Sequence, residues 1–215
     1  FYFLFGDMHK AVASSVLSAF FFGLASSLSY FRRRFLPLDI KNYSFLIIST
    51  ILGSIMGAYL LKLTPSYQLK RFFALFLIFI SINLFYGKRL AKDGNPKGMV
   101  PGNVLFFTGL LAGLIGAYFG VGGGIIMVPS LIHWGLDPIK AVAISASNVP
   151  VVTFFSLLNY LIYRILPEFS VMLFVVPFGI VGSNLGVRMA IRVPQIVLRR
   201  IFAIFVLLVA IKLLY

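Results

Sequence analysis

Long uncharged apolar stretches dominate the chain, and short loops rich in lysine and arginine separate them. No charged residue occurs in 11–31, 43–61, 72–86, 98–136, 141–163 or 169–187. A membrane-spanning helix needs about 20 mostly apolar residues. The pattern therefore predicts an all-α polytopic membrane protein, with ordinary spans at about 10–31, 43–62, 68–87, 139–163, 169–190 and 196–215.

The stretch 98–136 is too long for one helix and too short for two comfortable crossings. Its middle, Gly120 to Gly124, contains four glycines in five positions. Because glycine is a poor helix former, this cluster predicts a break between a helix at about 103–118 and a short helix at about 124–134. Such irregular backbone is tolerated at membrane depth only where protein covers it or where it lines a wet cavity.

The two halves of the sequence repeat each other. Residues 7–37 align without a gap with 137–167 and share 12 identities in 31 positions, and 53–86 align with 182–215 with 12 identities in 34. The matches include aspartate, lysine, arginine, proline and glycine, which apolar low-complexity sequence would not readily match by chance. The predicted domains are a first repeat at 1–87, a linker loop at 88–102 and a complete second repeat at 103–215.

In this alignment the first copy of the glycine cluster falls about ten positions before residue 1. The first repeat is therefore expected to lack its N-terminal glycine-broken segment, about 27 residues or more. The native protein is expected to carry two such segments, of which this chain holds one.

The distribution of basic residues predicts the topology. If the glycine-broken segment crosses the membrane, the repeats are parallel and the 19 basic residues divide nine against ten. If it is re-entrant, each repeat has three crossings, the repeats are inverted, and the division is 13 against six. The positive-inside rule favours the inverted arrangement, with 32–42 and 88–102 in the cytoplasm. Inverted repeats with broken helices are a common plan of secondary transporters.

Composition narrows the function further. Of 215 residues, 60% are hydrophobic and 11% charged, which excludes a soluble globular enzyme. The net charge is +14. The basic residues flank the apolar stretches, a pattern that suits contact with the membrane surface better than binding of nucleic acid. There is no cysteine, and His9 and His133 are isolated, so neither a metal site nor a cofactor is expected.

The glycine cluster is the first candidate site. Free N–H groups at a helix start attract anions, and glycine lets a ligand approach the backbone closely. The predicted substrate-binding residues here are Gly120, Gly122, Gly123, Gly124 and Pro129. The alternative is a tight hairpin tip or close helix packing. A bulky residue at Gly123 is expected to abolish transport without unfolding the chain.

Polar residues on the predicted helix 139–163 form the second candidate site. Ser145, Ser147 and Asn148 are the predicted ligand contacts there, joined by Ser15 on the matching helix and by Asn184. The alternative is hydrogen bonding between helices. Gly53-x-x-x-Gly57 and Gly182-x-x-x-Gly186 are interpreted as close-packing stripes.

All five acidic residues lie outside the apolar stretches, so no intramembrane carboxylate marks a proton or cation site. Asp7 and Asp137 are expected to cap the helices that follow them. No set of nucleophile, base and orienting group is present, which argues against an enzyme. A neutral cavity rich in glycine and serine, in a basic protein, suits a small anion.

The stretch Gly109–Pro129, with the sequence GLLAGLIGAYFGVGGGIIMVP, resembles the signature of the sulfite exporter TauE/SafE (TSUP) family of membrane permeases. Ala141–Asn148 is similar to the block that follows it in that family. The resemblance implies a multi-pass permease of a prokaryotic plasma (inner) membrane that moves sulfite, sulfonates or related organic anions. It also implies that Gly120–Gly124 and Ala141–Asn148 line the pathway. An anion channel, a non-transporting scaffold and a membrane enzyme are the alternatives, and a homodimer remains possible.

Overall fold

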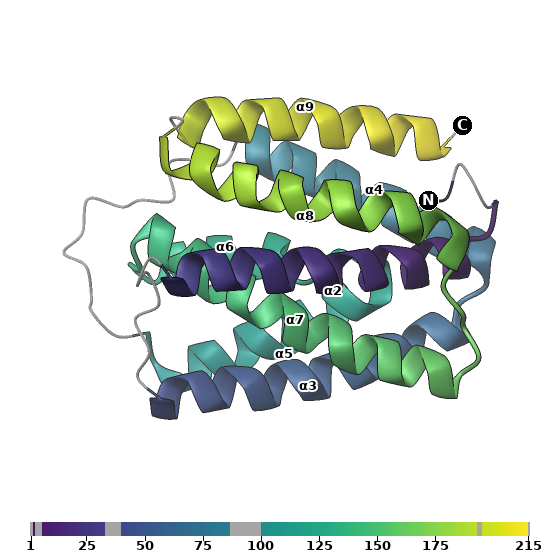
Figure 1. Cartoon of the computed structure of the whole chain (residues 1–215), viewed down its shortest axis with the longest axis horizontal. Helices are drawn as coiled ribbons and strands as arrows, with labels where there is room; N and C mark the ends of the chain where they lie inside the picture. Colours follow the sequence, from purple (N-terminus) through teal and green to yellow (C-terminus); the bar gives the residue numbers. More distant parts are fainter. Residues whose placement is uncertain (1, 3–5, 33–39, 87–99, 193–194, 215) are drawn as a thin grey trace.

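The computed structural model describes residues 2, 6–32, 40–86, 100–192 and 195–214, and the regular elements in these ranges are helices (Figure 1). They are α2 (Met8–Arg32), α3 (Ile40–Leu63), α4 (Ser66–Tyr86), α5 (Gly102–Phe119), α6 (Gly124–His133), α7 (Pro138–Ile162), α8 (Phe169–Arg192) and α9 (Gln195–Leu214). The all-helical prediction is confirmed. The six predicted spans correspond to α2, α3, α4, α7, α8 and α9, and the broken segment corresponds to α5 and α6.

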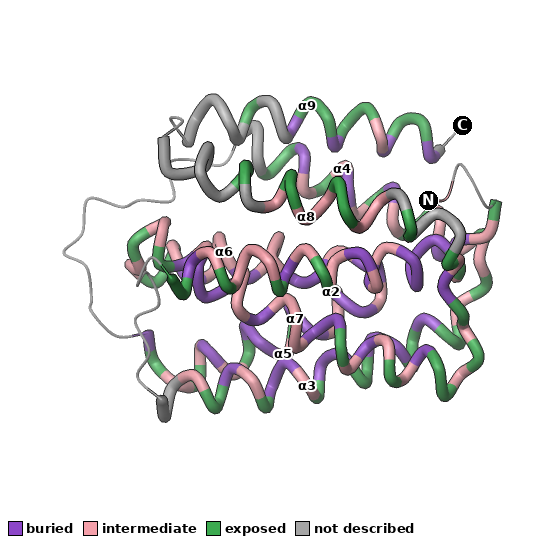
Figure 2. The backbone as a smooth tube through the Cα atoms, viewed as in Figure 1, coloured by how far each residue is buried: buried purple, intermediate pink, exposed green. Residues whose placement is uncertain are grey.

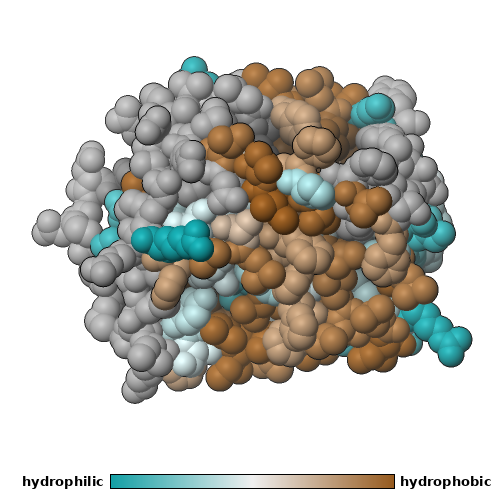
Figure 3. All heavy atoms as spheres, viewed as in Figure 1, coloured by the Kyte–Doolittle hydropathy of each residue, from teal (hydrophilic) through white to brown (hydrophobic). Residues whose placement is uncertain are grey.

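Four stretches of the described helices are long and apolar enough to cross a membrane: Met8–Arg32, Tyr43–Leu63, Gly102–Phe119 and Pro138–Ile162. At 1.5 Å per residue, even the 18-residue α5 is about 27 Å long, close to the thickness of the hydrocarbon core. Helices α4, α8 and α9 contain 21, 24 and 20 residues. In Figure 3, apolar surface covers the middle of the visible face, and hydrophilic residues gather mainly towards its two ends.

Two buried clusters define the two ends of the bundle. At the Met8 end, Met8 packs with residues from α3, α4, α5 and α7, including Leu61 and Tyr160. At the Leu46 end, Leu46 packs with Leu105, Leu131 and other residues of α5, α6 and α7. These contacts fix the helix directions. Helices α3, α5 and α7 run from the Leu46 end to the Met8 end, whereas α2 and α4 start at the Met8 end.

Each of three helices in the first half runs opposite to a helix in the second half. Helix α2 lies against α7 and antiparallel to it. Helix α4 lies against α9, where Ser81 Oγ donates to the carbonyl of Ala203 at 2.9 Å, so the late part of α4 meets the early part of α9. Helix α8 starts at the Met8 end, where the Glu168 N–H donates to Ser14 Oγ at 2.9 Å, and thus opposes α3.

The tightest helix pair is α3 with α5, and glycine makes the close approach possible. A Cβ placed on Gly53 would overlap the carbonyl oxygen of Leu110, and one on Gly57 would overlap that of Leu114. On the facing helix, a Cβ on Gly113 would overlap the carbonyl of Thr50. The interpretation of Gly53-x-x-x-Gly57 as a packing stripe is confirmed. Figure 2 shows many of the buried residues where α2, α3, α5 and α7 meet.

The start of α7 is held by a side-chain cap, as the sequence predicts. Asp137 Oδ1 accepts from the N–H groups of Ile139 and Lys140 at 3.0 and 3.2 Å. Asp7 likewise accepts from the His9 N–H at 2.9 Å. Replacing Asp137 with alanine leaves two N–H groups without this partner, so we expect thermal unfolding in detergent to show a loss of about 1 kcal/mol. Asp137→Asn, which keeps an acceptor, should recover most of that loss; equal losses would contradict the capping role.

Candidate functional site

The break between α5 and α6 consists of glycines in the left-handed region. The φ angles of Gly120, Gly122 and Gly123 are 74°, 69° and 76°. This region is strained for residues with a Cβ and open to glycine. Gly120 is the C-cap of α5 and Gly123 is the N-cap of α6, so the predicted break is confirmed.

Helix α6 folds back along α5 after the break. A Cβ on Gly123 would lie 2.5 Å from the carbonyl oxygen of Ala112, and one on Gly116 would lie 2.7 Å from the Gly123 nitrogen. Further along α6, Leu131 shares a cluster with Leu105, near the start of α5. The prediction that a bulky residue at Gly123 leaves the fold intact is therefore wrong, because it would both strain φ and collide with backbone.

Two side chains from neighbouring helices bind carbonyls at the end of α5. Ser15 Oγ on α2 donates to the Gly120 carbonyl at 2.8 Å, and the Tyr160 hydroxyl on α7 donates to the Ala117 carbonyl. The last carbonyls of a helix lack partners within it, so these bonds satisfy groups that the break exposes. Ser15 is predicted as a ligand contact, but here its hydroxyl donates its hydrogen bond to the backbone.

The N-terminus of α6 carries no side-chain cap. Its first N–H groups, on Gly124 and Ile125, come before any intrahelical acceptor is available to them. Ser145 is buried beside this terminus, and its Oγ lies 3.2 Å from the position of a Cβ on Gly124. The structure thus brings Gly124 and Ser145 together, at a helix end whose dipole is positive.

Asn148 lies one turn further along α7, near the middle of the bundle. Its side chain is 1% exposed, and Nδ2 donates to Thr50 Oγ1 at 2.9 Å and lies 3.9 Å from the Met127 sulfur. Asn148 Oδ1 is buried and has no hydrogen-bond partner within the described ranges. An unpaired buried polar atom costs about 1–3 kcal/mol. Asn148 therefore joins α7 to Thr50 of α3 and lies against Met127 in the second turn of α6.

The other predicted residues have different surroundings. Ser147 Oγ donates to the carbonyl of Ile144 at 2.8 Å and accepts from the Tyr43 hydroxyl at 3.0 Å, so it joins α7 to α3. Pro129 is half-buried within α6. Asn184 belongs to α8, but its side chain lies outside the described residues.

Comparison with known proteins decides the family. Residues 1–213 match the family model described as Sulfite exporter TauE/SafE. The chain belongs to the TauE/SafE family. This is a family of membrane transporters and not of enzymes, and the prediction that the chain is not an enzyme agrees with it.

The TauE/SafE chain has bacterial and archaeal relatives. "Probable membrane transporter protein YunE" of Bacillus subtilis (strain 168) is 31% identical over 154 residues, which cover 64% of this chain and 55% of the relative. "Probable membrane transporter protein MJ0441" of Methanocaldococcus jannaschii is 29% identical over 115 residues, covering 54% and 42%. A "Probable membrane transporter protein" of Xylella fastidiosa (strain 9a5c) is 30% identical over 173 residues, covering 78% and 65%. The matched region spans about half the length of the first two relatives. No solved structure matches the chain significantly.

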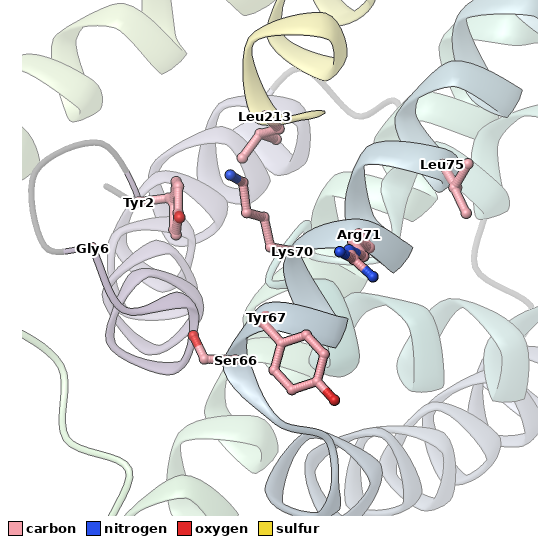
Figure 4. Close-up of a pocket in the computed structure, with 8 residues that line it drawn as sticks. All are labelled: Tyr2, Gly6, Ser66, Tyr67, Lys70, Arg71, Leu75 and Leu213. Atoms are coloured by element: carbon pink, nitrogen blue, oxygen red, sulfur yellow. The ribbon is translucent and has the colours of Figure 1, made fainter. Parts of the chain in front are cut away.

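The TauE/SafE chain also forms a pocket that the sequence analysis missed (Figure 4). Its volume is about 590 Å³, and it is lined by Tyr2, Gly6, Ser66, Tyr67, Lys70, Arg71, Leu75 and Leu213. Figure 4 shows Lys70 extending towards Tyr2 and Leu213, while Arg71 points away from them. The Lys70 ammonium lies 5.2 Å from the centre of the Tyr2 ring, a cation–π contact. Two cationic side chains, Lys70 and Arg71, therefore line this pocket, and Lys70 also contacts a ring.

Sequence reasoning missed Thr50 and Tyr160, which lie at this candidate site. Both are fully buried, and they hydrogen-bond Asn148 and the Ala117 carbonyl respectively. Tyr160 matches Tyr30 in the alignment of the two halves, and that match is a signal for it. Thr50 had only the weak signal of a polar residue one turn before Gly53 in an apolar stretch.

Proposed function

We propose that this chain is part of a secondary transporter that moves small anions, with sulfite and sulfonates as the first candidates, across a prokaryotic plasma membrane. The observation that carries the proposal is the uncapped N-terminus of α6, with the buried Ser145 beside Gly124 and Asn148 against Met127 of the same helix. The family description, sulfite exporter, supports the same class of substrate.

The proposed anion site lies between α6 and α7. The N–H groups of Gly124 and Ile125 and the positive end of the α6 dipole supply donors and field. Asn148 supplies the side-chain contact, because a half-turn of its carboxamide lets Oδ1 accept from the Thr50 hydroxyl and directs Nδ2 to the position without a partner. Ser145 lines the site beside Gly124. All the hydrogen-bond donors at this site belong to uncharged groups, so they can bind an anion and also release it.

The proposed mechanism is alternating access of two inverted repeats. The opposed directions of α2 and α7, of α3 and α8, and of α4 and α9 support the inversion, as do the sequence matches. The return of α6 along α5 supports a re-entrant segment. Rocking of one half against the other would expose a site at mid-height to each side in turn.

Uptake by proteoliposomes tests the function. The native polypeptide that contains this chain is reconstituted, and labelled sulfite is offered with unlabelled sulfite, sulfate or taurine as competitor. We expect saturable uptake that sulfite suppresses and that preloaded unlabelled sulfite accelerates by exchange. Uptake that rises linearly with concentration and shows no exchange would indicate a channel, and no uptake by monodisperse protein would contradict transport of these anions.

Gly124→Ala probes the site without disturbing the break. Gly124 has an ordinary φ, and an added Cβ would contact only Ser145 Oγ, at 3.2 Å. Because alanine favours a helix, the melting temperature should fall by no more than about 2 °C. The methyl group would intrude on the anion, and we expect sulfite uptake at low concentration to fall about tenfold, equal to about 1.4 kcal/mol of binding. Unchanged uptake would place the anion elsewhere.

A further inference from the structure

The pocket at the start of α4 contains two basic side chains without an acidic partner (Figure 4). Lys70 and Arg71 line it from the second turn of the helix. Neither forms an ion pair within the described part of the chain, and no lining residue is an aspartate or a glutamate. Helical side chains lean towards the N-terminus, so both charges lie towards the positive end of the α4 dipole. The charge balance of this pocket favours an anion.

The carboxylate that reaches the edge of the pocket is engaged by other groups. Asp7 Oδ1 accepts from Ser66 Oγ, which lines the pocket, at 3.2 Å, and from the His9 N–H at 2.9 Å. It also lies 3.5 Å from His9 Nδ1. Asp7 therefore joins the start of α2 to the start of α4, and it leaves the charges of Lys70 and Arg71 uncompensated.

An exposed row of side chains leads from the pocket along α4. The members of the row are spaced by four residues, so they lie on one face of the helix: Tyr67, Arg71, Leu75 and Phe79. All four are exposed, Phe79 to 64%. At 1.5 Å per residue, Leu75 and Phe79 lie about 6 and 12 Å beyond Arg71 along the helix axis. The row therefore carries a charge beside the pocket and apolar side chains further along the span predicted at 68–87.

This order of groups matches the order of groups in a phospholipid. Arginine and lysine place their charge at the level of the head groups while their stems lie against hydrocarbon, and tyrosine is enriched at the same level. Leu213, near the end of α9, lines the pocket and packs in a buried cluster with Ala74 of α4. The pocket thus lies at one end of the paired helices α4 and α9, where a membrane protein meets lipid head groups.

We propose that this pocket binds the head group of an anionic phospholipid, with Lys70 and Arg71 contacting the phosphodiester and an acyl chain lying along Leu75 and Phe79. The volume of about 590 Å³ is in the range of small-molecule sites. An anionic head group is favoured over a zwitterionic one, because no carboxylate lines the pocket to pair with choline or ethanolamine. A free anion would use the two charges but not the apolar row. The lipid site is separate from the anion site proposed at the start of α6.

Native mass spectrometry of the native polypeptide in detergent tests the proposal. The protein is mixed with equal amounts of phosphatidylglycerol and phosphatidylcholine that carry the same acyl chains, and the ratio of the two bound lipids is measured. A basic residue near an anionic membrane surface contributes about fivefold in affinity. We therefore expect the parent to prefer phosphatidylglycerol, and Lys70→Gln/Arg71→Gln to lower the ratio at least about tenfold.

The matched control is Lys62→Gln/Arg164→Gln. It removes the same two residue types from exposed positions at the Met8 end of the bundle, outside the pocket. Lys62 also resembles Lys70 in its surroundings, because its ammonium lies 4.8 Å from the centre of the Tyr163 ring. The lipid ratio of the control should stay within about threefold of the parent, less than the loss of one contributing cation. Melting temperatures show that both variants are folded.

Three outcomes would overturn the proposal. The first is a parent that binds both lipids equally, and the second is an equal loss of preference in the two double variants, which would indicate general surface charge. The third is displacement of bound lipid by excess inorganic phosphate or by glycerophosphoglycerol, the head group without acyl chains, which would assign the pocket to a free anion. Because no sulfite is present, these results are independent of the transport proposal.

Discussion

Replacing Gly113 with leucine is expected to separate α3 from α5 and to give the largest loss of stability of any single change discussed. Gly113 faces the Thr50 carbonyl directly, and a Cβ added to Gly113 would lie 2.9 Å from the Ser54 nitrogen. Both contacts are backbone atoms of a packed helix and cannot rotate away. Overpacking typically costs about 1–3 kcal/mol, and contact with backbone places this change at or above the upper limit. The melting temperature in detergent should fall by about 6–12 °C, or the chain should fail to fold.

The matched control for this change is Leu111→Phe on the same helix. Leu111 is 49% exposed and points away from the helix interface, so a larger side chain there has space. Its melting temperature should stay within about 2 °C of the parent. If Gly113→Leu proves as stable as this control, the close contact of α3 with α5 is not the packing that holds the bundle.

Asn148→Asp is expected to abolish anion uptake, because it places a negative charge at the proposed anion site. The side chain keeps its size, and a carboxylate oxygen can accept from the Thr50 hydroxyl in place of the bond that Asn148 Nδ2 donates to it, so the packing around it is largely kept. Two like charges 4 Å apart repel by about 4 kcal/mol at an effective dielectric constant of 20. Sulfite uptake by the native polypeptide in proteoliposomes should therefore fall at least about a hundredfold.

The sign of this effect distinguishes an anion site from a cation site. A site for a cation would keep or gain affinity when Asn148 becomes aspartate, and such a result would contradict the account. Asn159→Asp is the control, since Asn159 lies on the same helix about 16 Å along its axis and donates to the Phe155 carbonyl. Uptake by that variant should stay within about threefold of the parent.

The sequence predicted the features that depend on local backbone chemistry. Four glycines in five positions can continue neither an α-helix nor a lipid-exposed strand, so the break between α5 and α6 followed from composition. Asp137 ahead of Pro138 likewise indicated a capped start, because its acceptor lies within reach of the next N–H groups. These arguments need only neighbours in the chain.

The features that it missed depend on which helices meet. Nothing near Thr50 in the sequence shows that it faces Asn148, 98 residues away. Ser15 was predicted to contact ligand, but the fold turns its hydroxyl to the Gly120 carbonyl. Gly53 and Gly182 have the same local pattern, and only the fold shows that one is packed and the other open. Tertiary neighbours, which apolar periodicity does not encode, decide these roles.

The most direct test of the anion site is equilibrium binding of labelled sulfite to the purified native polypeptide in detergent. We expect a single saturable site that unlabelled sulfite displaces, that Asn159→Asp keeps, and that Asn148→Asp loses. Saturable binding that Asn148→Asp leaves unchanged, or no binding of sulfite, sulfate or taurine by monodisperse protein, would contradict an anion site at the start of α6.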